Sequence, residues 1–106
     1  MSEESGIEVF ETPTFKRVFK KLSESGKILV EDEIDRIIDD PVIGEQKKGD
    51  LSHLWVHKFK MNEQIVLLGY SWKEDELQLY LLNIGSHENF YRDAKKRRTA
   101  DLKTIR

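Results

Sequence analysis

The chain has 106 residues, close to the commonest size of one domain and too few for a catalytic domain with a regulatory one beside it. It contains no cysteine, which excludes disulfides, thiolate metal ligands and a cysteine nucleophile. Its formal net charge is −2, and no apolar run approaches the roughly 18 residues of a membrane span. The acidic start Met1-Ser2-Glu3-Glu4 is unlike a signal peptide, so we expect a cytoplasmic protein with no membrane partner.

The first half of the sequence predicts a short strand followed by two helices. Residues 1–6 are expected to be a loose end, and Ile7 to Glu11 alternates apolar and polar residues as a strand does. Thr12 and Pro13 favour a helix start, because threonine caps helices and proline suits the first turn. Two runs with helical spacing follow, separated by a turn predicted at residues 23–26: Phe15, Val18, Phe19, Leu22, and Val30, Ile34, Ile37, Ile38. Such a hairpin needs another surface to cover its apolar side.

The second half predicts that surface as a meander of three strands. Strand-like segments at residues 54–61, 64–72 and 77–84 are separated by short polar turns, which is typical of antiparallel pairing. Residues 87–98 are predicted to form a terminal helix, and the end from Thr99 to be loose. The predicted fold class is α+β, a single domain over residues 1–106 in which a helical hairpin packs on one face of a small antiparallel sheet.

Two lysines lie on the first strand of the meander, on the face opposite its aromatic residues. Because strand residues alternate between faces, Lys58 and Lys60 share one face, and Trp55, His57 and Phe59 share the other. The aromatic face is the expected core face, which places His57 near the helices and leaves open whether it belongs to a site. Lys58 and Lys60 either form a positive patch that suits a phosphate or an ordinary solvated sheet face.

A histidine and a tyrosine lie where the last strand gives way to the last helix. His87 can donate or accept a proton near neutral pH, and Tyr91, four residues on, lies on the same side of a helix. A tyrosine there can stack on a base. The residues alone leave open the alternatives that His87 is a surface or helix-cap residue and that Tyr91 packs on the sheet.

The basic surplus of the chain lies in its second half. Residues 51–106 hold 10 Lys and Arg against 7 Asp and Glu, whereas residues 1–50 hold 8 against 13. A basic C-terminal segment suits an anionic partner, although such segments are often only solvated. No metal or cofactor is expected: His53 and His57 would lie over roughly 13 Å apart on a strand, and no phosphate loop or serine triad is present.

The chain resembles toxins of the RelE/ParE superfamily, from bacterial type II toxin–antitoxin modules. The order of the predicted elements matches, and so does a glycine–lysine–glycine–leucine spacing before the meander, at Gly44, Lys48, Gly49 and Leu51. The segment from Ile84 to Arg92 resembles the family motif at the end of the sheet, an apolar residue, glycine, any residue, then arginine or histidine, followed by an aromatic residue. The likeness covers about residues 7–98.

The resemblance implies one of two activities and a cognate antitoxin partner. RelE-like members cut mRNA on the ribosome without a metal, whereas ParE-like members bind and poison DNA gyrase. Carried onto this sequence, the nuclease pattern gives Lys58, His87 and Tyr91 as catalytic residues. The residues expected to bind RNA are Lys60, Arg92, Lys95 and Lys96. The basic C-terminal helix is where an acidic antitoxin is expected to bind.

The sequence also departs from the nuclease pattern. Gln64, Ile65 and Val66 stand where many family nucleases have an arginine, and Val56 where a second lysine is often found. The chain is mildly acidic, whereas ribosome-binding toxins are commonly basic. His87 with Tyr91 still favours an endoribonuclease, because a gyrase-binding toxin has no need of an acid–base histidine.

Overall fold

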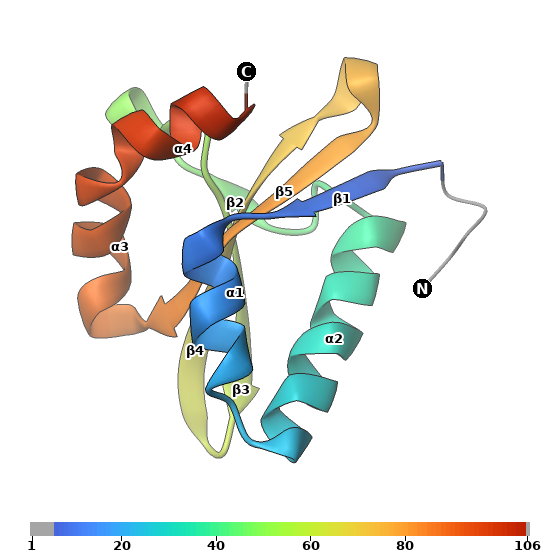
Figure 1. Ribbon diagram of the computed structural model, residues 1–106, viewed down its shortest axis with the longest axis vertical. Coiled ribbons are helices and arrows are strands. Elements are labelled where there is room, and N and C mark those ends of the chain that lie inside the picture. The colour runs from blue at the N-terminus through green and yellow to red at the C-terminus, as the bar shows by residue number, and fades with distance from the viewer. Residues whose placement is uncertain (1–5, 106) are drawn as a thin grey trace.

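The computed structural model describes residues 6–105, which form one five-stranded sheet with helices on both faces (Figure 1). The elements in chain order are β1 (Glu8–Glu11), α1 (Pro13–Lys20), α2 (Glu24–Asp39), β2 (Glu45–Gln46), η1 (Gly49–Leu51), β3 (Trp55–Met61), β4 (Gln64–Lys73), η2 (Glu74–Glu76), β5 (Gln78–Ser86), α3 (His87–Lys96) and α4 (Arg98–Ile105). The predicted α+β fold, with its helical hairpin and meander, is confirmed.

The strand order in the sheet is β1-β5-β4-β3-β2. The meander β3-β4-β5 is antiparallel as predicted, and its first turn is made by Asn62 and Glu63, both with positive φ. β1 instead pairs with β5 in parallel, so the sheet is mixed. This pairing stops at Leu81 because the chain then turns into α1, and the rest of β5 keeps one edge without a strand partner.

Both helices of the hairpin begin at a hydroxyl cap. Thr12 Oγ1 accepts a hydrogen bond from the Phe15 amide at 3.0 Å and donates to the Leu82 carbonyl at 2.8 Å, which ties the start of α1 to β5. Ser23 Oγ accepts from the Gly26 amide at 3.1 Å, so α2 starts at Glu24. The turn predicted over residues 23–26 is therefore wrong after its first residue, because Ser23 caps the helix instead of leading into a loop.

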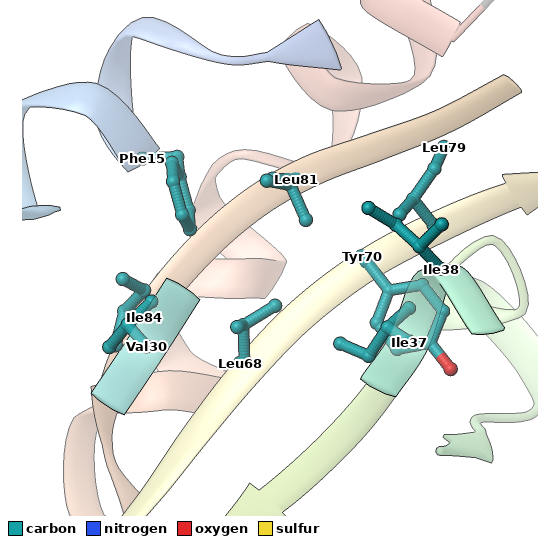
Figure 2. Packing of buried hydrophobic residues seen from close by; sticks show 9 residues of the cluster. All are labelled: Phe15, Val30, Ile37, Ile38, Leu68, Tyr70, Leu79, Leu81 and Ile84. Atoms are coloured by element: carbon teal, nitrogen blue, oxygen red, sulfur yellow. The ribbon is translucent and has the colours of Figure 1, made fainter. Parts of the chain in front are cut away.

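The α1–α2 hairpin covers one face of the sheet and builds the larger core there. Figure 2 shows side chains from both helices meeting those of β4 and β5. Its buried members are Phe15, Val30, Ile37, Ile38, Leu68, Tyr70, Leu79, Leu81 and Ile84. Trp55, Phe59 and Met61 of β3 pack against this cluster, which confirms that the aromatic face of β3 is a core face.

The opposite face carries a smaller core under α3. Phe90 and Ala94 of α3 are buried against Leu67 and Leu82, among others. A Cβ atom added at Gly69 would lie 2.5 Å from Phe90 Cζ, so glycine is required there for α3 to approach β4. This core buries Val56 of β3 but leaves Lys58 and Lys60 of the same strand exposed, so α3 covers only part of this face.

The chain after Thr99 is helical, not loose as predicted. α4 follows α3 closely, and the side chain of its Asp101 is buried. Lys73 Nζ donates a hydrogen bond to the Ile105 carbonyl at 3.0 Å, which holds the end of α4. Its few apolar residues do not form an apolar face along the helix, so tertiary packing rather than a sequence pattern stabilises it. Of the loose end predicted for residues 1–6, only Gly6 lies within the described residues. No helix of the described chain is long and apolar enough to cross a membrane.

Candidate functional site

Lys58 lies on the same face of the sheet as α3. It pairs with Leu67 of β4, which pairs in turn with Gly85 of β5, and residues in such a cross-strand row point to one face. Leu67 belongs to the core beneath α3. Lys58 and Lys60 are both exposed, because α3 does not reach across to β3. The prediction that these lysines project from the open face is confirmed.

His87 and Tyr91 stand together at the start of α3. His87 is the first residue of the helix and is exposed, and its ring lies edge-on to that of Tyr91 with centroids 6.2 Å apart. Tyr91 is half-buried, with its ring 5.3 Å from that of Phe90. Tyr91 thus packs on the small core and still presents an aromatic ring beside the histidine.

A third side chain, Lys47, completes this group, although no pattern in the sequence marks it. Lys47 Nζ lies 5.1 Å from the centroid of the Tyr91 ring, within cation–π range, and 2.9 Å from Glu45 Oε1. The hydrogen bond to Glu45 raises the pKa of Lys47, with a smaller contribution from Tyr91, against the effect of partial burial. Lys47 is therefore a fixed positive charge at neutral pH.

Glu45 lies between Lys47 and the lysines of β3, Lys58 and Lys60. It pairs with Val56 on β3, which places it on the face that bears Lys58. The hydrogen bond from Lys47 lowers the pKa of Glu45, and the charges of Lys58 and Lys48 add to the effect. In the sequence this segment is marked only by the spacing of its glycines, and it comes close to α3 only in the folded chain. We name Lys47, Lys58, Lys60, His87 and Tyr91 together the candidate site.

The short strand β2 is held against the sheet by Tyr70. The Tyr70 hydroxyl donates to the Pro41 carbonyl at 2.7 Å and accepts from the Gly44 amide at 3.0 Å. A Cβ atom added at Gly44 would lie 2.7 Å from that hydroxyl oxygen and 2.9 Å from the Val56 carbonyl oxygen. Gly44 is therefore needed so that the segment bearing Lys47 can lie close to the sheet.

The other predicted RNA-binding residues lie around α3 rather than at the candidate site. Arg92 is exposed and donates to Asn89 Oδ1 at 2.7 Å, and Lys95 is exposed on the helix surface. Lys96 lies on the flank of α3 that faces α1. These placements leave their role in RNA binding a prediction.

His57 lies in the core between α2 and β3. Its Nε2 is 2.6 Å from Glu33 Oε1, and both residues are 9% exposed. This hydrogen bond points away from Lys58, so the structure places His57 outside the candidate site. Within residues 6–105, no three His, Asp or Glu side chains are arranged to hold a metal ion.

The candidate site combines the groups that phosphate chemistry in RNA uses. An exposed imidazole can transfer a proton, an aromatic ring can stack on a base, and clustered ammonium groups can stabilise negative charge as it develops.

A family model, described as the ParE-like toxin of type II bacterial toxin–antitoxin systems, matches residues 9–95. The chain belongs to this family. The matched range runs from β1 almost to the end of α3, so it includes every residue of the candidate site.

The solved structures similar to this ParE-like toxin include RelE proteins, alone or in complexes. A double mutant of the E. coli RelE toxin in the free state has a TM-score of 0.67 and 16% identity, covering 86% of this chain and 96% of that one. A RelBE toxin–antitoxin complex of Mycobacterium tuberculosis has a TM-score of 0.64 and 17% identity, and the match covers 76% of this chain and 98% of that one. At such identities the likeness shows the RelE-like fold alone.

The curated relatives that match are much longer proteins. Human and mouse dedicator of cytokinesis protein 9 are each 37% identical over 67 residues, which is 62% of this chain. The chain spans about 3% of their length, so their match carries no activity over to this toxin.

Proposed function

We propose that this toxin is a ribosome-dependent mRNA endonuclease that needs no metal and inhibits translation in the cytoplasm. The observation that carries the proposal is the grouping of an exposed histidine, an aromatic ring and lysines at one open part of the sheet. His87 lies edge-on to the ring of Tyr91, and Lys47 Nζ lies over that ring. A toxin that only binds its target needs neither a proton donor nor this concentration of charge.

The distance between strands supports the binding of a phosphodiester between the side chains of Lys58 and His87. Lys58 is two strands from Gly85, which is about 10 Å at the usual distance between strands. His87 follows Gly85 by two residues. Both side chains are long enough to approach a phosphate in that gap from opposite sides, as an acid–base pair must.

In the proposed reaction the RNA supplies its own nucleophile. Lys58, in its neutral amine form, accepts the proton of the ribose 2′-hydroxyl, and the 2′-oxygen attacks the adjacent phosphorus. Lys47 and Lys60 stabilise the negative charge of the phosphorane. The bond from phosphorus to the 5′-oxygen breaks as His87 donates a proton to that oxygen, which leaves a 2′,3′-cyclic phosphate and a 5′-hydroxyl. Tyr91 stacks on a neighbouring base.

The proposed partners are the ribosome with its mRNA, and a cognate antitoxin. The antitoxin is supported by the membership in a toxin–antitoxin family and by the similarity to toxins solved in complexes. A segment that is disordered when free and orders on the toxin is the binding mode we expect.

The test is to induce the chain in a bacterial host and to map the 5′ ends of mRNA. The wild-type chain should produce cuts phased with codons inside translated frames, and His87→Ala should abolish them without unfolding the protein. Glu88→Ala, at the next exposed position of α3, is the matched control and should cut as wild type does.

Two results would contradict the proposal. Undiminished cutting by His87→Ala would remove that residue from the mechanism. Growth arrest with intact mRNA and a DNA damage response would favour the gyrase-poisoning activity instead.

A further inference from the structure

A basic hollow lies between α1 and α3, on the side of α3 away from the candidate site. Its volume is about 280 Å³. Three cations line it, Arg17 of α1, Lys96 of α3 and Arg97 just after α3, together with one carboxylate, that of Asp93. Figure 1 shows the two helices flanking the end of β5, where that strand has passed its last contact with β1. The hollow is thus bounded by the edge that β1 leaves unpaired.

The cations of the hollow have little to neutralise them within the protein. Among residues 6–105, the side chains of Arg17 and Lys96 form no hydrogen bond and no ion pair. Arg97 has only a long contact, with its Nε 3.9 Å from Asp101 Oδ1. Asp93 forms no ion pair with a described residue either, so the lining carries three cations against one carboxylate.

Neutral hydrogen-bond donors face the same hollow. Asn83 Oδ1 accepts from the Ile84 amide at 2.9 Å, which fixes the side chain and leaves its NH₂ group to donate. The hydroxyl of Thr14 also lies at the hollow and has no hydrogen-bond partner among the described residues. Guanidinium, ammonium, amide and hydroxyl donors around one small space suit the oxygens of a phosphate.

We propose that this hollow binds a backbone phosphate of RNA, as a second anchor beyond the candidate site. The two flanks of α3 carry the two sites: Tyr91 lies on one and Lys96 on the other. A helix with its side chains is only about 10–12 Å across, so one RNA strand can reach both. The inference rests on the proposed function, because RNA is the substrate of that function.

The test measures binding of a short single-stranded RNA to the free protein at several salt concentrations. The His87→Ala protein serves as the background, so that the chain can be expressed without arresting its host. In that background Arg17→Gln and Lys96→Gln should each weaken binding about tenfold, and each should reduce the salt dependence by about one phosphate contact. The matched controls Lys16→Gln and Lys103→Gln remove exposed charges outside the hollow and should have less than a twofold effect.

A second measurement titrates inorganic phosphate into the same protein and follows the side-chain NMR signals of Arg17 and Asn83. Shifts at both residues support the proposal. Equal weakening by hollow and control variants would overturn it in favour of general surface charge. RNA binding unchanged in the hollow variants, with a polyglutamate peptide bound more weakly, would overturn it in favour of a carboxylate partner.

The outcomes separate this inference from the proposed function. If wild-type protein cuts mRNA but the hollow variants bind RNA normally, only the second anchor is wrong. If mRNA stays intact while the hollow variants lose affinity for RNA, the nuclease proposal is wrong and the RNA-binding hollow stands.

Discussion

The two faces of the sheet differ in how completely they are covered. On the hairpin face, two helices bury nine residues and meet every strand of the meander, and even the polar pair of His57 and Glu33 is nearly sealed from solvent. On the other face, the cover under α3 includes β4, β5 and Val56 at the start of β3, but Lys58 and Lys60 farther along β3 stay exposed. One strand, β3, thus supplies core residues to one face and candidate site residues to the other.

The two faces show that burial, rather than residue type, decides whether a side chain of this chain stabilises the fold or belongs to the candidate site. His57 and His87 have the same chemistry. His57 is enclosed and bonded to a carboxylate, so it holds α2 to β3, whereas His87 stands in solvent beside an aromatic ring. The difference can be tested by disturbing each face by a similar amount.

The largest effect is expected from truncating a buried phenylalanine on each face. Phe15 and Phe90 are both 1% exposed, on the hairpin face and the α3 face respectively. Changing either to alanine should lower the free energy of unfolding by about 3–5 kcal/mol, measured by urea denaturation. Phe90→Ala should in addition abolish mRNA cutting at temperatures where it stays folded, because Phe90 seats the helix that carries His87 and Tyr91.

Phe15→Ala provides the comparison for activity. It should cut mRNA in proportion to its folded fraction, because its cavity lies on the face away from the candidate site. Equal residual activity in the two folded variants would mean that α3 is positioned by something other than Phe90.

A smaller effect is expected from breaking the buried pair on the hairpin face. Glu33→Gln removes the carboxylate that His57 contacts at 2.6 Å and should cost about 1–3 kcal/mol of stability. The folded protein should keep its activity, since the pair points away from Lys58. Asp32→Asn, at the exposed neighbouring position, is the matched control and should change stability by under about 0.5 kcal/mol. A loss of activity without a loss of stability would place His57 in the site after all.

The smallest effect concerns pH and the buried carboxyl of α4. Burial raises the pKa of Asp101 from 3.8 to about 6, with the nearby Arg97 opposing the shift. The folded protein therefore holds this proton more tightly than the unfolded chain, so the stability it contributes is full below about pH 3.8 and is lost as the pH rises through about 6. Asp101→Asn should raise the free energy of unfolding at pH 7.5 by about 1–2 kcal/mol.

The pH profile distinguishes this cause from others. Urea denaturation of wild type and Asp101→Asn should give converging stabilities as the pH falls to about 4. Asp75→Asn, an exposed carboxyl in the turn before β5, should track wild type throughout. A constant difference between Asp101→Asn and wild type at every pH would indicate a packing effect instead.

The sequence predicted most of the fold because its local signals agree with the packing. Thr12 and Pro13 start α1, the alternation on β3 identifies the core face, and Asn62 and Glu63 form the first turn of the meander. It missed α4, where no helical pattern exists, and the parallel pairing of β1, which depends on a contact with the far end of the chain. The residues of one short strand do not indicate which distant strand it pairs with, or in which direction.

The candidate site was predictable only in part, for a similar reason. His87 and Tyr91 are four residues apart on one helix, so helical spacing alone brings them together. Lys47 reaches Tyr91 only because β2 pairs with β3 and α3 folds back over the sheet, contacts between distant parts of the chain. The only sequence signal near Lys47 was Gly44. Its role, to let β2 lie close to the sheet, is evident only from its contact with Tyr70 in the folded chain.

The parallel pair of β1 and β5 has a consequence for synthesis of the chain. Glu8 is paired with Gln78, and Thr12 bonds to Leu82 across 70 residues of sequence. Closing so long a loop comes late in folding, since the entropy of closure precedes any gain from the contact. A nascent chain therefore exposes the apolar side of its first two helices until β5 leaves the ribosomal tunnel. The toxin fold is completed only after β5 has been translated, so the antitoxin has no complete native surface to bind before that point.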